Sequence, residues 1–313
     1  LINALPDEVA VMTSVSAGVS AVASSLDYGG KRNKIVVSDF EFPTVAQIWH
    51  AQERRGARVE HVPVAGNTIP YEAFERAVDE ETLLLSITHV SFRTGAKQDV
   101  AALTHLAHRR GAMVLLDSYQ ALGTMPIDVR QLDVDFLVGG ALKYLLASAG
   151  LAFLYVRGDL LPQLHPTSMG WFSQEDIFAM DIYRNQPAST ARRFESGTPP
   201  IPNIYAGEAG LALIQRVGAE AIECQIRELT DHLISGAMRQ GFNVVTPLKP
   251  SRRGALVTIK SNDIHTLVHR LAERSIVASS RDDNLRISPH FYNNHDDIEQ
   301  VLEGLRANRE LLA

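Results

Sequence analysis

Short apolar segments rich in β-branched residues alternate with segments of helical periodicity along the first half of the chain. A short strand before residue 16 and six further strands are predicted, at residues 34–38, 57–62, 83–90, 113–117, 136–140 and 151–156; helices are predicted at 16–26, 43–55, 70–79 and 98–110. Buried strands separated by helices are typical of a mostly parallel sheet covered on both faces. The pattern predicts an α/β large domain with a mostly parallel sheet of the seven-stranded type.

The pattern changes after residue 200. A long helical stretch over 201–241, predicted to contain two helices, leads to the remaining elements: strands at 255–261, 276–280 and 285–289, and helices at 263–274 and 295–310. We therefore predict a large domain over 1–205, followed by linking helices and a small C-terminal α+β domain over 206–313. The opening residues LINALPDEVAVMTSVSAG read as a helix end that enters a strand and a tight loop, so we expect an N-terminal segment upstream that this chain lacks.

In open parallel sheets, ligands bind beside the carboxyl ends of the strands. This rule places the loops that follow the predicted strands in one crevice, namely residues 13–18, 39–44, 89–95, 117–120 and 139–143. The first of these loops contains serines and a glycine ahead of a helix, where free backbone N–H groups and the helix dipole bind phosphate. Ser16 and Ala17 are the phosphate-binding candidates, although serine is also an ordinary N-cap.

One lysine, Lys143, interrupts the otherwise apolar run DFLVGGALKYLLASAGLAFLYV. A lysine in a core loses hydration, so chains avoid it unless the amine pairs with an anion, clamps a phosphate or acts as a nucleophile. The alternative is a surface lysine whose stem lies along the protein. Asp117 ends a buried strand with Gln120 three residues later, and Phe42 follows another strand.

These residues together match the needs of one cofactor. Pyridoxal phosphate requires a lysine for its aldehyde, an acid for its pyridinium nitrogen, donors for its phosphate and a flat group against its ring. Lys143, Asp117, Ser16 and Phe42 supply these functions, and the Gln120 amide is expected to reach a ring oxygen. Each feature alone also has a structural explanation, such as a capping Asp117 or a core Phe42.

The composition of the chain excludes several kinds of binding partner. The 313 residues carry a formal net charge of −6, which argues against nucleic acid or an anionic membrane as the main partner. A single cysteine excludes an internal disulfide and indicates a reducing cytoplasm, and no apolar run reaches membrane-spanning length. The pairs His105/His108 and His265/His269 lack a third ligand, so no metal site is predicted.

The chain resembles the class V aminotransferase family of fold-type I pyridoxal phosphate enzymes, in its kynureninase-like branch. ALKYLLASAGLAFLYV is similar to the kynureninase lysine segment, FEFPT to that family's Phe-Pro, and GWFSQEDIFAMD to its Gly-Trp-Phe segment. RRFESGTPPIPNIYAGEAGL is similar to a desulfurase motif, and LRISPHFYNNHDDIEQVLEGL to the C-terminal segment that carries a carboxylate-binding arginine.

The resemblance implies roles for particular residues. Lys143 would hold the cofactor as a Schiff base, Phe42 would stack on its ring, and Arg286 would bind the substrate α-carboxylate. Gly197 and Thr198 would reach the phosphate in a partner subunit, which implies a homodimer with shared active sites. Arg93 follows a crevice strand, where it can meet a substrate anion, and His89 lies near the expected ring, with a satisfied core histidine as the alternative; both are further substrate-binding candidates.

The sequence departs from its relatives at several positions. Gln120 stands where kynureninases usually carry His, Leu142 replaces a phosphate-binding Tyr, and Gly140 replaces a phosphate-binding Ser or Thr of desulfurases. The segment ASSRDDN lacks the reactive cysteine of desulfurases, and we interpret Cys224 as a small buried hydrophobe. Both observations argue against desulfurase activity.

These observations predict a pyridoxal phosphate enzyme that acts on an amino acid, and transamination is the first choice of reaction. A lyase, a hydrolase of the kynureninase type and an epimerase are alternatives on the same scaffold. A non-catalytic binding relative with a degraded cofactor site is an alternative of a different class. Gly140 and Leu142 favour it, whereas Lys143, Asp117 and Arg286 argue against it.

Overall fold

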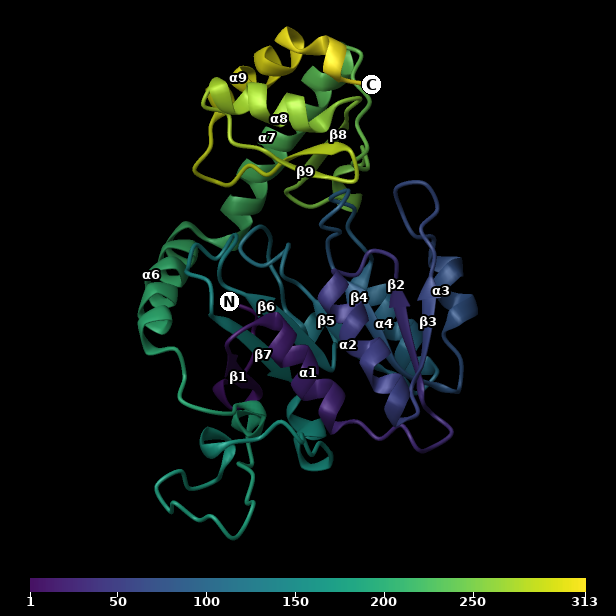
Figure 1. Cartoon of the computed structure of the whole chain (residues 1–313), viewed down its shortest axis with the longest axis vertical. Helices are drawn as coiled ribbons and strands as arrows, with labels where there is room; N and C mark the ends of the chain where they lie inside the picture. Colours follow the sequence, from purple (N-terminus) through teal and green to yellow (C-terminus); the bar gives the residue numbers. More distant parts are fainter.

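A seven-stranded sheet forms the centre of the large part of the molecule (Figure 1). The computed structural model describes residues 1–313, and the strand order is β1-β7-β6-β5-β4-β2-β3. The strands are β1 (Val9–Met12), β2 (Lys34–Ser38), β3 (Arg58–Val62), β4 (Thr82–Thr88), β5 (Met113–Asp117), β6 (Phe136–Gly140) and β7 (Ala152–Val156). Neighbours from β3 to β6 pair in parallel, and β7 pairs antiparallel with β6 and β1. The predicted, mostly parallel seven-stranded sheet is confirmed.

Two hydrophobic cores cover the two faces of this sheet. Successive strand residues alternate between them: Leu84 belongs to one core with Val19 and Trp49, whereas Leu85 belongs to the other with Leu103. This alternation follows from the two-residue period of a strand. The helices of this part are α1 (Val15–Ser25), α2 (Pro43–Ala51), α3 (Tyr71–Ala77), α4 (Val100–Arg109) and α5 (Val129–Leu132).

A small antiparallel sheet forms the second unit, at the top of Figure 1. Its order is β8-β10-β9, and its elements are β8 (Val257–Lys260), β9 (Ser279–Arg281), β10 (Asn284–Ile287), α8 (Ile264–Glu273) and α9 (His295–Ala307). Leu285 and Ile287 of β10 pack in one core with side chains of α8, α9 and α7 (Ala219–Arg239). The helices therefore cover one face of this sheet.

The predicted helical stretch over 201–241 is confirmed as two helices, α6 (Ile201–Val217) and α7, which meet at Gly218 with φ +90°. The predicted strand over 276–280 is wrong at its start, because β9 begins only at Ser279. The Ile276 N–H donates to Leu271 O in the turn that ends α8. The division near residue 205 stays a prediction.

Cys224 is exposed, so its interpretation as a buried hydrophobe is wrong. The buried residues around it on α7 are Ile222 and Ile226, each two positions away. Two residues correspond to about 200° around a helix, which turns Cys224 toward solvent.

The small unit is joined to the loop that follows β4. Thr258 Oγ1 donates to Arg93 O at 3.1 Å, and Thr246 Oγ1 donates to Thr94 O at 2.7 Å. Gly95 adopts φ +74°, and a Cβ there would lie 2.1 Å from Leu256 O. Only glycine fits this close crossing, which holds the loop against the small sheet.

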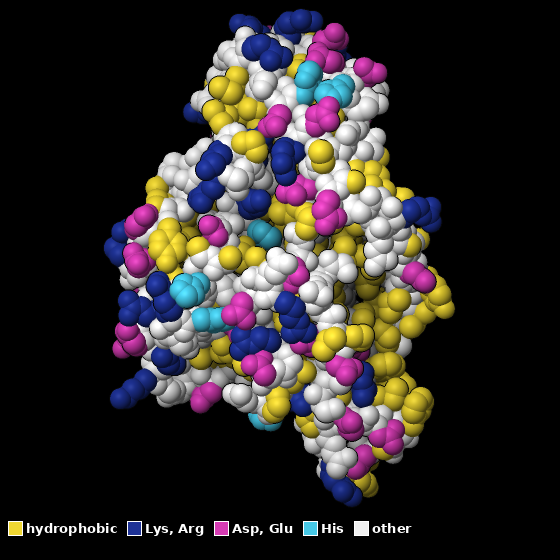
Figure 2. Space-filling model, turned by 180° about the vertical axis from the view of Figure 1, so that it is seen from behind, with side chains coloured by type: hydrophobic (Ala, Val, Ile, Leu, Met, Phe, Trp, Pro, Cys, Tyr) yellow, Lys and Arg dark blue, Asp and Glu magenta, His cyan; other side chains and the backbone are white.

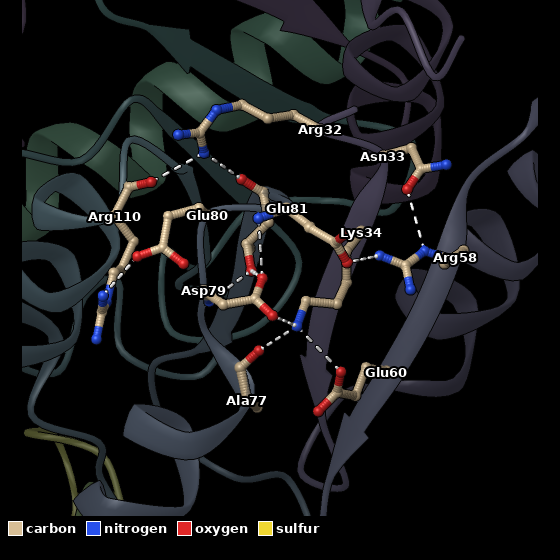
Figure 3. A network of polar contacts seen from close by, with 11 residues as sticks. Arg32, Asn33, Lys34, Arg58, Glu60, Ala77, Asp79, Glu80, Glu81 and Arg110 are labelled. Carbon is tan, nitrogen blue, oxygen red and sulfur yellow. Dashed lines mark hydrogen bonds and ion pairs between the residues drawn. The ribbon is translucent and has the colours of Figure 1, made fainter. Parts of the chain in front are cut away.

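Ion pairs and hydrogen bonds close the amino-terminal edge of the large sheet (Figure 3). Lys34 is 5% exposed, and its Nζ donates to Ala77 O at 2.6 Å and Asp79 Oδ2 at 2.8 Å, with Glu60 at 3.2 Å. Arg32 donates to the carbonyls of two neighbouring segments at 3.0 and 2.9 Å. Every charge of this network has a fixed partner, so its role is structural.

No helix of the structure has the length and apolar character needed to cross a membrane.

Candidate active site

The carboxyl ends of three neighbouring strands meet at the opposite edge of the large sheet. Asp117 at the end of β5 is in register with Thr88 of β4 and with Val138 of β6. A cavity of about 300 Å³ opens there, with these lining residues: Thr13, Ser14, Val15, Ser16, Phe42, Thr44, Thr88, Val90, Phe92, Asp117, Tyr119, Gln120, Leu142, Lys143, Ala149, Gly150, Leu151 and Ala152. The predicted Ser16, Phe42, Asp117, Gln120 and Lys143 therefore share one site.

Lys143 presents an amine without an ion pair. Its Nζ lies 4.4 Å from the centroid of the Tyr119 ring, and no carboxylate lies within salt-bridge distance. Burial lowers the pKa of Lys143; the charge of Asp117 opposes this shift, and those of Arg286 and Arg281 add to it. A lowered pKa increases the neutral fraction of the amine, which is the nucleophilic form.

Helix α6 holds the segment that carries Lys143. A Cβ on Gly210 would lie 2.4 Å from Leu145 O, and one on Gly207 would lie 2.3 Å from the Leu151 side chain. The absence of side chains at these positions lets the segment pack directly on the helix. His290 Nε2 lies 3.0 Å from Tyr144 O and joins the same segment to the small unit.

Asp117 is buried, and its Oδ1 accepts the Tyr119 N–H at 2.9 Å. Burial raises the pKa of Asp117, and the Tyr119 N–H and the charge of Lys143 oppose this shift. Nearby, Gln120 Nε2 and Thr88 Oγ1 are buried without a hydrogen-bond partner. A carboxyl group beside unused polar atoms fits a ring that has a protonated nitrogen and an oxygen substituent.

The N-termini of α1 and α2 meet at the far end of the cavity. Ser14 Oγ accepts the Ala17 N–H at 3.0 Å, so the predicted phosphate ligand Ala17 already serves the helix cap. Ser16 Oγ lies 3.0 Å from Thr44 Oγ1, which pairs hydroxyl groups from the two helices. Hydroxyls and helix N-termini suit a phosphate.

Phe42 is 43% exposed and lines the cavity. Its ring meets Phe92 in an edge-to-face contact with 5.1 Å between centroids. This contact fixes the ring at the start of α2, where a flat ligand can stack on it.

The other predicted residues lie outside the cavity lining. His89 is buried with Nδ1 at 3.0 Å from Ser118 Oγ, and burial together with the charge of Lys97 lowers its pKa to about 3, so its ring is neutral. Arg93 pairs with Asp282 at 3.1 Å, and Arg286 lies on β10. Gly197 and Thr198 belong to an exposed loop before α6, away from the lining of their own chain's cavity.

Tyr119 is a site residue that the sequence patterns do not reveal. A Cβ on Gly140 would lie 2.3 Å from Tyr119 Cζ and 2.6 Å from Tyr119 Oη. The tyrosine therefore occupies the space that a side chain at position 140 would need, and it brings a hydroxyl to the cavity. The residue type alone carries no signal for this, because the ring direction depends on packing across two strands.

Glu41 is a buried acid beside the cavity that the sequence patterns also do not reveal. It is buried beside Asp117, and neither carboxyl oxygen forms a hydrogen bond of good geometry. The Ser86 and Thr88 hydroxyls lie close enough to oppose the rise in its pKa, but their geometry falls short of a hydrogen bond. Burial, together with the charge of Asp117, raises the pKa of Glu41 to about 8. The carboxyl of Glu41 is therefore mostly protonated at neutral pH.

The residues present fit pyridoxal phosphate. The cavity combines an unpaired lysine, a buried acid, unused polar atoms, hydroxyls at helix N-termini and an aromatic face. No group of three or more His, Cys, Asp or Glu residues is arranged to hold a metal ion.

The fold matches that of solved structures. The apo structure of a cysteine desulfurase from Thermococcus onnurineus NA1 superposes with a TM-score of 0.89 at 23% identity, covering 97% of this chain and 80% of that one. At this identity the likeness concerns the fold, and it confirms the predicted fold-type I architecture.

Sequence relatives extend the likeness. A protein of Bacillus subtilis described as an uncharacterized aminotransferase, YcbU, is 33% identical over 307 residues, covering 98% of this chain and 80% of the relative. A kynureninase of Deinococcus radiodurans is 30% identical over 316 residues, covering 98% and 75%. The model of the family described as Aminotransferase class-V matches residues 1–301. The chain belongs to this family, whose cofactor is pyridoxal phosphate, and the predicted resemblance is confirmed.

Glu41→Gln tests the protonated carboxyl. An acid whose pKa is higher in the folded state binds more protons there, so stability falls as the pH rises from about 4.5 to about 8. Between pH 5 and 9 we expect the wild type to lose on the order of 3 kcal/mol more than Glu41→Gln. Urea unfolding measures this, with the exposed Glu75→Gln as the control. Equal losses in wild type and Glu41→Gln would show that Glu41 is ionised throughout.

Gly140→Ala tests the packing of Tyr119. The new Cβ would displace the ring, and we expect the free energy of unfolding to fall by about 1–3 kcal/mol. Gly30→Ala is the matched control, because a Cβ there meets nothing within 4 Å. The penalty should shrink when Tyr119→Ala is also present. Equal costs at positions 140 and 30 would contradict the contact.

Proposed function

We propose that this chain is a pyridoxal phosphate-dependent aminotransferase that acts on an amino acid and binds its cofactor through Lys143. The observation that carries the proposal is the Lys143 amine, which lines the cavity without an ion pair while Asp117 and Phe42 line the same cavity. The relative from Bacillus subtilis that is named as an aminotransferase supports the choice of reaction.

The bound cofactor would supply an aldehyde that captures an amine and a ring that withdraws electrons from the substrate's α-carbon. The Asp117 carboxylate would face the ring nitrogen, and Gln120 Nε2 would donate to the ring oxygen. Phe42 would cover the ring. Ser16, Thr44 and the N–H groups at the start of α1 would hold the phosphate, with Tyr119 Oη as a further donor in place of a side chain at position 140.

Lys143 has a second role as the base. Its lowered pKa leaves a fraction of the amine neutral, and Nζ can then accept the proton of the substrate α-carbon and return it elsewhere. Arg286 would bind the α-carboxylate through its planar guanidinium. The other two substrate-binding candidates already have partners, since Arg93 pairs with Asp282 and the His89 ring contacts Ser118 Oγ.

Other outcomes at the α-carbon define the alternatives, namely a lyase, a hydrolase of the kynureninase type or an epimerase. Desulfurase activity is disfavoured because the turn between β9 and β10 has no cysteine and Cys224, on α7, lies outside the lining of the cavity. An amino-acid screen that follows keto acid, alanine and ammonia separately distinguishes transamination from these reactions. A location in the reducing cytoplasm, inferred from the single cysteine, is also part of this proposal.

We also propose a homodimer whose partners share active sites. An apolar groove between α6 and β1/β7 lies open on one flank, where hydrophobic side chains gather in Figure 2. Phe178, Ile182 and Tyr183 project from the neighbouring long loop with 80–90% of their surfaces exposed. Burying both surfaces against a second copy would bring Gly197 and Thr198 of one chain to the phosphate of the other.

Lys143→Ala tests the attachment. We expect borohydride to fix the cofactor to the wild type at Lys143 and to leave Lys143→Ala unlabelled, because the nucleophile is gone while the fold remains. Mass spectrometry of the reduced peptides locates the label, and Lys249→Ala on the surface is the control. Covalent cofactor in Lys143→Ala would refute the assignment.

Thr198→Val tests the shared site. The substitution removes a hydroxyl and little volume, so we expect roughly tenfold weaker cofactor binding with unchanged folding. Cofactor titration and sedimentation measure the two properties, and the exposed Thr167→Val is the control. A fully active monomer, or unaltered affinity in Thr198→Val, would be incompatible with sharing.

A further inference from the structure

Two arginines share the polar face of the small sheet. In the hairpin of β9 and β10, Arg281 is opposite Asn284, and Arg286 is opposite Ser279. Directly opposed residues project from the same face, so Arg281 and Arg286 lie together there. Leu285 occupies the other face, which packs on the helices of the small unit.

This polar face borders the cavity of the large unit. The Arg281 guanidinium lies 5.7 Å from the centroid of the Phe92 ring, and Phe92 lines the cavity. Thr258 of β8, which is opposite Arg286, donates to Arg93 O at 3.1 Å. The sheet face is thereby held against the loop of residues 91–97, and both arginines are placed beside the cavity mouth.

These two guanidiniums lack a fixed anion, in contrast to their neighbour. Arg93 also lies over Phe92, at 5.5 Å, but it pairs with Asp282 at 3.1 Å. The exposed side chain of Arg281 makes no ion pair or hydrogen bond, and the Arg286 Nε is buried without a partner. Burial lowers the pKa of Arg286 and the charge of Arg281 lowers it further; Tyr144 and Asp282 oppose the shift.

Unpaired guanidiniums on one face form a site for more than one anionic group. The proposed function assigns Arg286 to the substrate α-carboxylate, which leaves Arg281 free. We infer that Arg281 recognises a second carboxylate, so that the preferred substrate is an amino acid with an acidic side chain. This inference rests on the proposed function, and Arg281 is a specificity-determining residue within it.

Binding of unreactive acids tests the inference without turnover. Succinate and butyrate have the same number of carbons, and only succinate carries two carboxylates. By calorimetry on the holoenzyme we expect succinate to bind about tenfold more tightly than butyrate. Arg281→Gln should abolish this preference, Arg281→Lys should retain part of it, and Arg306→Gln, which removes an exposed arginine of α9, should leave it intact. Equal binding of the two acids by the wild type would overturn the inference.

Turnover gives the second readout. We expect the wild type to prefer aspartate or glutamate over asparagine or glutamine, and Arg281→Gln to raise KM for the acidic member by about tenfold with little change in kcat.

Loss of cofactor affinity in Arg281→Gln would assign this arginine to the phosphate instead and overturn the inference. Cofactor fixed at Lys143 without any preference for acids would refute the inference and leave the proposed function standing. A wild type that takes up no cofactor would refute the proposed function, and succinate binding to that protein would still decide the role of Arg281.

Discussion

The parallel pairing of β4, β5 and β6 is the constraint on which the site depends. Strands in register end at the same edge, so Thr88 and Asp117 lie side by side and the segment with Lys143 begins next to them. The two cores fix this register, because a slip of one residue would exchange the side chains that face them. The glycines of α6 then hold the lysine segment close to the strand ends. Stability and chemistry are thus set by the same pairing.

Two lysines show how the sheet separates structural from chemical charges. Lys34 begins β2 and has a carbonyl and two carboxylates as partners (Figure 3). Lys143 follows β6 and has an aromatic ring below its amine and no fixed anion. A buried charge with partners stabilises one conformation, whereas an unpaired amine keeps a high free energy that a ligand can lower. The lysine at the amino-terminal edge of the sheet therefore has fixed partners, whereas the lysine at the carboxyl-terminal edge is available to bind a ligand.

The sequence patterns predicted the sheet, the small α+β unit and the residues at strand ends, because these follow from local periodicity and from the geometry of parallel sheets. Tyr119 and Glu41 escaped prediction, since their directions depend on packing across neighbouring strands. Arg281 escaped because the pairing register of a hairpin is not readable from composition. Cys224 was misjudged because the phase of a helix decides exposure and the residue type does not. Side-chain direction is thus the information that the sequence patterns lacked.

The charges around the cavity link binding to proton transfer. Burial lowers the pKa of Lys143, and Arg286 and Arg281 lower it further, while Asp117 is the carboxylate that opposes them. Carboxylates of a substrate held by those arginines would offset their effect on the amine. With Lys143 in its proposed role, the amine would be less basic before a substrate is held by these arginines, and a neutral amine is the form that attacks an aldehyde. An anionic substrate on the arginines would raise its basicity again, which suits the proposed role of Lys143 as the base.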